Sequence, residues 1–510
     1  MLHVTSVTLM KHSRGEVRPI PAPHTQPGLM PRVTHDAVVI VPGIMGSELY
    51  DTSTDTVIWG IADVGWLTKA WLRRKGLASL HLTPEERTGD YRRVQARRLL
   101  QTPVWSPFLR GIEPYTRLVA LAQATAAHHD AVMTFPYDWR LPVAVNAQRL
   151  AGEARTHLHN WLSNPAQTHA RRQAIEDRPA RLVFIAHSMG GLITNAALTL
   201  GGDSDLAADT RGILTLGTPF EGSVVAANIL NALQGSPLPL PHTSLAAAAA
   251  TMPAVHELLP RFQCLEDGLD VRRLMASDVD AIGGDKELFT RAQDFYTALY
   301  ARPLPPQQPV VGVRQDTVQS LTITHGVVRA SEYCFLTNAN RELICDPNGV
   351  PRRMPTWGDG TVHRLSAALS TPTIPVAAQH GALASNKRAL PLIEDFLLDH
   401  DALIRGPEQG DDGIGLTVPD FVTPNSRWEC AVTGTDDPAE VELSVAAADG
   451  TWSSEQFSFD VADDDRLSTQ VTLPDVGLYR VTAKAAYGPE VTQIVFAGPD
   501  ESSLKHLAED

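Results

Sequence analysis

Residues 181–191 read RLVFIAHSMGG. The apolar run from Leu182 to Ala186 predicts a buried parallel strand, and the small residues after it predict a tight turn. Apolar residues then recur at helical spacing at Leu192, Ile193, Ala196, Ala197 and Leu200. A glycine pair directly after them ends the helical pattern. A serine at the tip of a strand–turn–helix unit is held clear of the sheet, close to the free N–H groups of the helix. The pattern therefore makes Ser188 the candidate nucleophile.

The turn around Ser188 matches the Gly-x-Ser-x-Gly nucleophile elbow except at its first position, which is Ala186. Alanine is small enough for a tight turn, so we interpret the stretch as an elbow. The alternative is a chance match in a chain rich in glycine and alanine. The residues elsewhere in the sequence have to distinguish the two.

The length and composition indicate a soluble globular protein with more than one domain, since the chain has 510 residues and 43% of them are hydrophobic. Residues Met1 to Pro31 contain many prolines and lack the compact apolar core of a secretory signal. No stretch approaches the length of a membrane span. We therefore expect a loose tail at residues 1–36 and a cytoplasmic location.

The net charge of -15 is concentrated at the C-terminal end. From Arg405 onward there are 6 basic and 21 acidic residues, which leaves 37 of each sign in residues 1–404. The neutral balance of the larger part does not favour nucleic acid as a partner.

A second loop with the character of a catalytic turn lies near the N-terminus. Residues 37–41 (AVVIV) predict a short strand, which ends in the glycine-containing loop PGIMGS at residues 42–47. An early strand that runs into such a loop is where an α/β-hydrolase forms one half of its oxyanion hole. The donors would be the backbone N–H groups of Ile44 and Met189, and the alternative is an ordinary turn after a strand.

Strands and helices alternate through residues 37–404, which predicts a mostly parallel, doubly wound sheet with helices on both faces. Residues 224–302 interrupt this alternation with an alanine-rich, helical pattern. We expect this insertion to form a cap that shields an acyl chain from water. A rigid subdomain without that role is the alternative.

The acid and the base of a serine hydrolase follow Ser188 in the order that an α/β-hydrolase uses. Asp359 lies in the segment WGDGTV at residues 357–362, and His380 begins the segment HGAL at residues 380–383. Asp359 would orient His380, and His380 would deprotonate Ser188. The competing residues are His187, which more often packs beneath an elbow, His363, which is close to Asp359 in sequence, and Asp138, which precedes the serine.

Residues Trp59 to Leu82 contain tryptophans and leucines that alternate with lysines and arginines. Such a stretch either contacts a membrane surface transiently or packs on the core.

Farther along the chain, Cys334 and Cys345 flank a predicted hairpin in which they would lie opposite each other, as a disulfide or as two reduced thiols.

Beyond a polar linker at Arg405 to Gly413, short runs of alternating apolar and polar residues are separated by turn residues. This spacing predicts an immunoglobulin-like β-sandwich within residues 405–510. Tyr479, in the segment DVGLYRV at residues 475–481, resembles the tyrosine corner of such sandwiches. The acidic surface is either a docking site for an unidentified protein partner or simply a solubilising surface.

The chain resembles the lecithin:cholesterol acyltransferase family, whose relatives include phospholipid:diacylglycerol acyltransferases and lysosomal phospholipases of A type. The matching segments occur in family order from residue 37 to about residue 400. They are Val41–Leu49, Pro136–Arg140, Ala186–Gly191, Leu216–Ser223, Glu257–Pro260, Gly358–Val362 and His380–Gly381. The C-terminal sandwich lies outside this resemblance.

The resemblance implies an α/β-hydrolase that opens glycerolipid esters through Ser188, Asp359 and His380 and can pass the acyl group to an alcohol. It also implies that Trp139 and Arg140 lie near the acyl-lipid substrate. We expect a serine-dependent lipid acyltransferase or acyl hydrolase that needs no metal or other cofactor. The alternatives are a carboxylesterase for small soluble esters and a non-catalytic scaffold that binds lipid or a partner.

Overall fold

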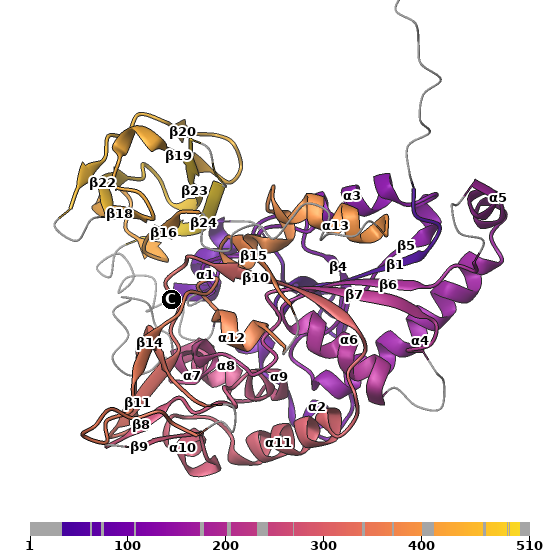
Figure 1. Cartoon of the computed structure of the whole chain (residues 1–510), viewed down its shortest axis with the longest axis horizontal. Helices are drawn as coiled ribbons and strands as arrows, with labels where there is room; N and C mark the ends of the chain where they lie inside the picture. The colour runs from indigo at the N-terminus through magenta and orange to yellow at the C-terminus, as the bar shows by residue number, and fades with distance from the viewer. Residues whose placement is uncertain are drawn as a thin grey trace, which may run out of the picture. The chain divides into compact units, whose positions relative to one another are not determined.

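The computed structural model of the chain (Figure 1) describes most of residues 33–499. The described ranges are 33–61, 64–72, 76–106, 109–173, 178–200, 206–231, 243–268, 270–338, 342–369, 372–399, 413–462, 466–486, 488 and 490–499. The predicted tail falls outside them except for residues 33–36, where Asp36 forms an ion pair with Arg178. The predicted linker also lies outside the described residues, apart from Gly413.

A six-stranded parallel sheet forms the centre of the larger part of the chain. Its strands are β1 (Ala37–Val41), β5 (Val132–Thr134), β6 (Leu182–His187), β7 (Thr210–Leu216), β10 (Gln307–Val313) and β15 (Ile374–Ala377), in the spatial order β15-β10-β7-β6-β1-β5. The runs at β1 and β6 are completely buried, as their continuous apolar sequences predict for central parallel strands.

Helices cover both faces of this sheet. Figure 1 shows α3 (Thr116–Thr125) and α13 (Ala389–Leu397) on one face, and α4 (Val143–Leu162) and α6 (Met189–Leu200) on the other. Helix α5 (Pro165–Gln173) follows α4. The helix α4 buries the apolar side that the sequence predicts, which includes Ala147, Leu150, Ala154, Leu158 and Trp161. The parallel sheet covered by helices on both faces confirms the predicted doubly wound α/β fold.

The segment between β1 and β5 forms a small antiparallel sheet and short helices. These elements are β2 (Ser47–Asp51), β3 (Thr56–Trp59), α1 (Val64–Leu72), η1 (Ala78–Leu80), α2 (Pro84–Arg87), β4 (Val94–Leu99) and η2 (His129–Ala131).

The described aromatic and leucine side chains named for the stretch Trp59–Leu82 pack largely on the core. Trp59 is fully buried between Trp139 and Trp71, with ring centroids 5.5 and 6.4 Å away. Leu67, Leu77 and Leu80 are buried as well. This burial supports the core-packing alternative. The membrane contact stays a prediction, because the cationic residues 73–75 of the stretch lie outside the described residues.

The predicted cap is helical and includes more of the chain than residues 224–302. It contains α7 (Val224–Leu230), α8 (Thr243–Ala249), α9 (Pro253–Glu257), β8 (Leu265–Asp267), β9 (Asp270–Arg272), α10 (Ala276–Ala281) and α11 (Lys286–Tyr300). Strand β8 pairs with β11 (Ser320–Thr324), which pairs with β12 (Val327–Ser331), so later residues complete a four-stranded sheet.

The remaining elements before the sandwich are β13 (Tyr333–Phe335), β14 (Arg353–Pro355), α12 (Arg364–Ala367) and η3 (His380–Ser385). Cys334 does not lie opposite Cys345 as the hairpin prediction expected, because its partner in the β13–β14 pair is Met354. The backbone of Cys345 forms an isolated β-bridge with that of Pro351. Both cysteines are free thiols.

The C-terminal part is a β-sandwich of two sheets. One has the order β16-β18-β22-β21 and the other β17-β24-β23-β19-β20. The strands are β16 (Gly415–Thr417), β17 (Phe421–Val422), β18 (Arg427–Thr433), β19 (Val441–Ala447), β20 (Ser453–Ser454), β21 (Asp460–Val461), β22 (Leu467–Thr472), β23 (Gly477–Ala485) and β24 (Glu490–Ala497), with η5 (Pro438–Glu440) between β18 and β19.

The hydrogen bond expected of a tyrosine corner is present, because Tyr479 Oη donates to the carbonyl of Asp475 over 3.0 Å. The immunoglobulin-like assignment of the sandwich stays a prediction. Among the residues that the structure describes, no helix has the length and apolar character needed to cross a bilayer.

Candidate active site

Ser188 lies at the tip of the turn between strand β6 and helix α6. Its φ of 53° is in the left-handed region, which a non-glycine residue adopts only where the surroundings enforce it. The backbone of Ser188 is fixed on both sides, since its N–H donates to Leu216 O (2.8 Å) and its carbonyl accepts from Thr218 Oγ1 (2.9 Å). A strained serine held in this way has its hydroxyl directed away from the sheet, as a nucleophile elbow requires.

The glycine two positions after the serine, Gly190, is required by close packing. A Cβ at Gly190 would lie 2.5 Å from the carbonyl oxygen of Pro42, so only glycine lets helix α6 begin against the loop after β1. Ala186, by contrast, belongs to the extended and fully buried strand β6, where no glycine is needed. This position explains why alanine is tolerated at the first place of the motif.

Ser188, His380 and Asp359 form one hydrogen-bonded series. Ser188 Oγ is 2.8 Å from His380 Nε2, and His380 Nδ1 is 2.7 Å from Asp359 Oδ2. The other carboxylate oxygen of Asp359 accepts backbone N–H groups from Thr361 (3.0 Å) and Val362 (2.7 Å). The loops after three different strands thus bring the three predicted residues together, and a fully buried carboxylate holds the imidazole in one orientation.

Of the two residues predicted to form the oxyanion hole, Met189 follows Ser188 in the chain and Ile44 lines the same pocket as Ser188. Met189 is the first residue of α6, and the first N–H groups of a helix have no partner within the helix. Ile44 lies beside Ser188 in the wall of the same pocket. Its loop is fixed by Tyr137 Oη, which donates to Pro42 O (2.9 Å), and by Trp59 Nε1, which donates to Met45 O (2.8 Å).

The competing histidines and the competing acid occupy other positions. His187 lies beneath the elbow, with Nε2 2.9 Å from the carbonyl of His380 and Nδ1 2.7 Å from Tyr115 Oη. Burial, followed by the charge of His380, lowers the pKa of His187 to about 3. His363 is also buried, stacks edge-on against Phe262, and has its pKa lowered by burial to about 4. Asp138 is paired with Arg140.

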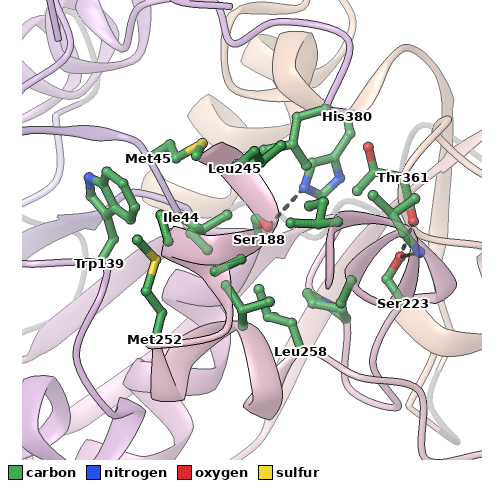
Figure 2. Close-up of a pocket in the computed structure, with 18 of the residues that line it drawn as sticks. Ile44, Met45, Trp139, Ser188, Ser223, Leu245, Met252, Leu258, Thr361 and His380 are labelled. Carbon is green, nitrogen blue, oxygen red and sulfur yellow. Dashed lines mark hydrogen bonds between the residues drawn. The ribbon is translucent and has the colours of Figure 1, made fainter. Parts of the chain in front are cut away.

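An apolar pocket opens at Ser188 and His380 (Figure 2), with about 720 Å³ of empty space that includes a part open to solvent. Its walls come from the loop after β1, from η1 and from the cap helices α7, α8 and α9. The lining includes Ile44, Met45, Leu77, Leu80, Trp139, Val225, Ile229, Leu245, Met252 and Leu258. No charged aspartate, glutamate, lysine or arginine is among the described residues that line it. A wall of this composition suits a hydrocarbon chain.

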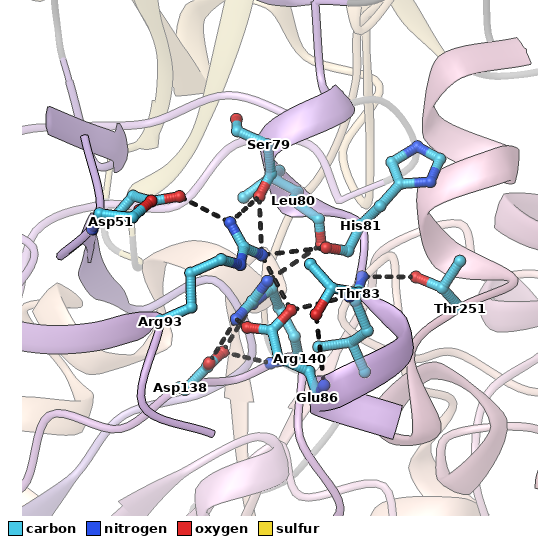
Figure 3. A network of polar contacts seen from close by, with 12 residues as sticks. Asp51, Ser79, Leu80, His81, Thr83, Glu86, Arg93, Asp138, Arg140 and Thr251 are labelled. Atoms are coloured by element: carbon cyan, nitrogen blue, oxygen red, sulfur yellow. Dashed lines mark hydrogen bonds and ion pairs between the residues drawn. The ribbon is translucent and has the colours of Figure 1, made fainter. Parts of the chain in front are cut away.

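The structure separates the two residues predicted to lie near the substrate. Trp139 lines the pocket, and its Nε1 donates to Ser47 O (3.3 Å). Arg140 is fully buried away from the pocket wall and forms ion pairs with Asp138 (2.7 Å) and Glu86 (2.8 Å). Figure 3 shows that the ion-pair network continues from Glu86 to Arg93 and Asp51. Arg140 is therefore engaged by two buried acids and is not among the described residues that line the pocket.

Sequence reasoning missed three buried polar groups near the site. Tyr115 accepts a hydrogen bond from Gly43 N (2.9 Å) in the oxyanion loop. Glu257 accepts one from Val143 N at the start of α4 (2.8 Å). Gln379, the residue before His380, bonds to the C-terminal sandwich. Glu257 begins the family-matching segment Glu257–Pro260, but that match assigned its carboxyl group no role, and no sequence pattern singled out Gln379 or Tyr115.

A parallel sheet wound on both faces by helices, with a serine at an elbow and a histidine and an aspartate on later loops, defines the class of α/β-hydrolases. The family model described as "Lecithin:cholesterol acyltransferase" matches residues 109–297, which include Ser188 and end before Asp359 and His380. This match confirms the resemblance to that family and supports an enzyme of the acyltransferase or lipase type.

No curated protein sequence matches the chain significantly. Among solved structures, a chain from "The crystal structure of Tle4-Tli4 complex" is 14% identical, with 71% of this chain and 98% of that chain covered and a TM-score of 0.45. A superoxide reductase (neelaredoxin) variant from Ignicoccus hospitalis is 11% identical, with 17% and 80% covered and a TM-score of 0.14. Scores of this size do not support a functional inference.

Proposed function

We propose that the protein is a serine-dependent acyl hydrolase or O-acyltransferase that acts on glycerolipid esters through a covalent acyl-enzyme. The observation that carries this proposal is the series from Ser188 to His380 to Asp359, with distances of 2.8 and 2.7 Å, at the edge of an apolar pocket. The match to an acyltransferase family supports the choice of lipid esters.

The first half of the reaction forms the acyl-enzyme. His380 Nε2 takes the proton of Ser188 Oγ while that oxygen attacks the ester carbonyl, and Asp359 stabilises the imidazolium that results. The tetrahedral oxyanion accepts hydrogen bonds from the N–H groups of Ile44 and Met189. His380 then gives its proton to the leaving alcohol as the ester C–O bond breaks, and the acyl group stays on Ser188.

The second half repeats these steps with a new nucleophile. His380 takes a proton from water or from an alcohol, the oxygen attacks the acyl-enzyme, and Ser188 leaves as the protonated hydroxyl. Water yields a fatty acid, and an alcohol yields a new ester. The acyl chain lies against the apolar wall in both cases, since that wall offers it burial and offers a polar head group no charged partner.

A fluorophosphonate probe tests the nucleophile. We expect the wild-type protein to be labelled, Ser188→Ala to lose labelling, and ester turnover to fall by about 10³-fold or more. Ser223→Ala is the matched control, because Ser223 also lines the pocket but its hydroxyl caps α7 and donates to Thr361 O. Labelling that survives Ser188→Ala would contradict the proposal.

Chain-length preference tests the substrate class. Ala226 is buried in the pocket wall on α7, so Ala226→Phe is expected to obstruct long acyl chains and to leave short ones accessible. Rates are compared for matched esters of short and long acyl chains. Wild-type turnover confined to short chains would instead indicate a carboxylesterase for small esters. A labelled phospholipid, incubated with and without a long-chain alcohol or a sterol, then separates transfer from hydrolysis.

A further inference from the structure

Two buried glutamines connect the C-terminal sandwich to the loop that carries His380. The side-chain amide of Gln379 donates to the carbonyl of Leu416 in β16 (3.0 Å) and to Gln315 Oε1 (3.1 Å). Gln315 Oε1 also accepts the N–H of Leu416 (3.1 Å), and Gln315 Nε2 donates to the carbonyl of Ile414 (3.2 Å). Both glutamine side chains are almost completely buried. The edge strand β16 of the sandwich therefore contacts Gln379, which directly precedes the candidate base His380.

The same glutamine reaches the loop of the candidate acid. The backbone N–H of Gln315 donates to Gly358 O (3.0 Å), and Gly358 N donates back to Gln315 O (3.3 Å). Thr317 Oγ1, two residues farther on, accepts the N–H of Gly360 (2.8 Å). Asp359 is therefore held on both sides by a segment that β16 contacts directly.

A second contact reaches the His380 loop from another strand of the sandwich. Arg480 in β23 forms a two-pronged ion pair with Glu113, with Nε–Oε1 and Nη2–Oε2 distances of 2.7 and 3.0 Å. The backbone N–H of Glu113 donates to the carbonyl of Gly381 (2.9 Å), the residue after His380. His380 thus has a sandwich-linked contact before it and another after it.

Apolar packing continues through this region without a break. Val313, at the end of β10, and Val362, after Asp359, belong to the same buried cluster as Leu416 and Val432 of the sandwich. The other sheet of the sandwich also packs on the larger part of the chain, since the ring centroids of Phe496 in β24 and Trp105 are 5.2 Å apart. A tethered but independent module would not share its hydrophobic core with the loops of a neighbouring catalytic centre.

We propose that the C-terminal sandwich positions the acid and base loops, with Gln315, Gln379 and the Glu113–Arg480 pair as positioning residues. This role rests on the proposed function, because it presumes that His380 and Asp359 act in catalysis. Asp359 lies between the short elements β14 and α12, and His380 is the first residue of the short 3-10 helix η3, so neither residue belongs to a strand of the central sheet. An error of about 1 Å in a catalytic group can cost about 10²-fold in rate. The contacts with the sandwich restrain the segments that carry Asp359 and His380.

The test compares two basic residues of strand β23. Arg480 pairs with Glu113 outside the sandwich, whereas Lys484 pairs with Glu442 inside it (3.1 Å). Arg480→Ala is expected to lower kcat and the rate of fluorophosphonate labelling by about tenfold, with KM changed less than about twofold. Lys484→Ala should match the wild type, and Arg480→Lys should recover part of the loss. A purely structural contact would lower thermal stability without this split between kcat and KM.

A double-mutant cycle with Glu113→Ala supplies the second measurement. If Arg480 acts on His380 through Glu113, the double variant should lose no more kcat than either single variant. Should Arg480→Ala fail to fold, Glu113→Ala alone is expected to give the same kcat loss. Wild-type kcat and labelling rates in a folded Arg480→Ala or Glu113→Ala protein would overturn the positioning role, while labelling of wild-type Ser188 would leave the proposed function standing. Absence of labelling in the wild type would refute both.

Discussion

Tyr115 and His187 are hydrogen-bonded beneath the nucleophile, with Tyr115 Oη 2.7 Å from His187 Nδ1. The other ring nitrogen of His187 faces the carbonyl of His380, which can only accept, so Nε2 carries the proton and Nδ1 accepts from the tyrosine. The pKa of His187, lowered by burial to about 3, agrees with this neutral form. Tyr115 Oη in turn accepts the N–H of Gly43, which links the elbow to the oxyanion loop.

Replacing Tyr115 with phenylalanine is therefore expected to weaken both stability and catalysis. The change leaves Gly43 N–H and His187 Nδ1 without a partner in a buried place, at a cost of about 1–3 kcal/mol for each group. The oxyanion loop also loses a restraint, so kcat should fall more than KM rises. Thermal unfolding and ester turnover measure the two effects. The partly exposed Tyr91→Phe serves as control, and an unchanged melting temperature in Tyr115→Phe would refute the linkage.

The buried carboxyl group of Glu257 is expected to make the folded protein less stable toward alkaline pH. Burial raises the pKa of this carboxyl group from an ordinary value of 4.5 to about 8, and the hydrogen bond from Val143 N opposes the rise only in part. Because the folded state keeps a proton that the unfolded state releases, the stabilisation is full below pH 4.5. It is lost as the pH rises to about 8.

The variant Glu257→Gln keeps an acceptor for Val143 N–H and does not ionise. Relative to the wild type, it should gain about 1.4 kcal/mol of unfolding free energy for each pH unit within that window. Melting temperatures recorded from pH 5 to pH 9 provide the measurement, with Glu85→Gln on the exposed side of α2 as control. Parallel curves for Glu257→Gln and the wild type would show that the group is ionised throughout.

The sequence was sufficient for the parts of the site that depend on local pattern and chain order. The elbow at Ser188 follows from a strand, a turn and a helix, and the order of Asp359 and His380 follows from the fold class. The sequence could not place Arg140, because a charged residue beside a motif tryptophan looks the same whether it faces substrate or two buried acids. The bonds of Gln379 to the sandwich join segments far apart in sequence, so no local pattern could indicate them.

The position of Arg140 predicts a structural effect where the sequence suggested substrate binding. Substitution by glutamine leaves Asp138 and Glu86 as buried acids with fewer cationic partners, and breaking a buried pair of this kind costs about 3–5 kcal/mol. We expect a large drop in melting temperature and an unchanged KM at temperatures where the variant is folded. Arg98→Gln, whose half-exposed side chain pairs with Glu48, should change stability by about 1 kcal/mol or less. A raised KM in stable Arg140→Gln protein would restore the substrate-binding interpretation.

Gly217 gives the most direct test of the acid and base geometry without changing either residue. This glycine directly follows strand β7 and has a φ of 59°, and a Cβ placed on it would lie 2.7 Å from Asp359 Oδ2 and 3.1 Å from His380 Nδ1. Gly217→Ala should therefore push the carboxylate and the imidazole apart and lower kcat by about 10²-fold. The left-handed backbone adds a stability cost of about 1–2 kcal/mol. Gly152→Ala is the matched control, because Gly152 is exposed within α4 with nothing near its Cβ position and alanine there should stabilise the helix by about 0.5–1 kcal/mol. Wild-type kcat in Gly217→Ala would mean that the contact between Asp359 and His380 does not limit the reaction.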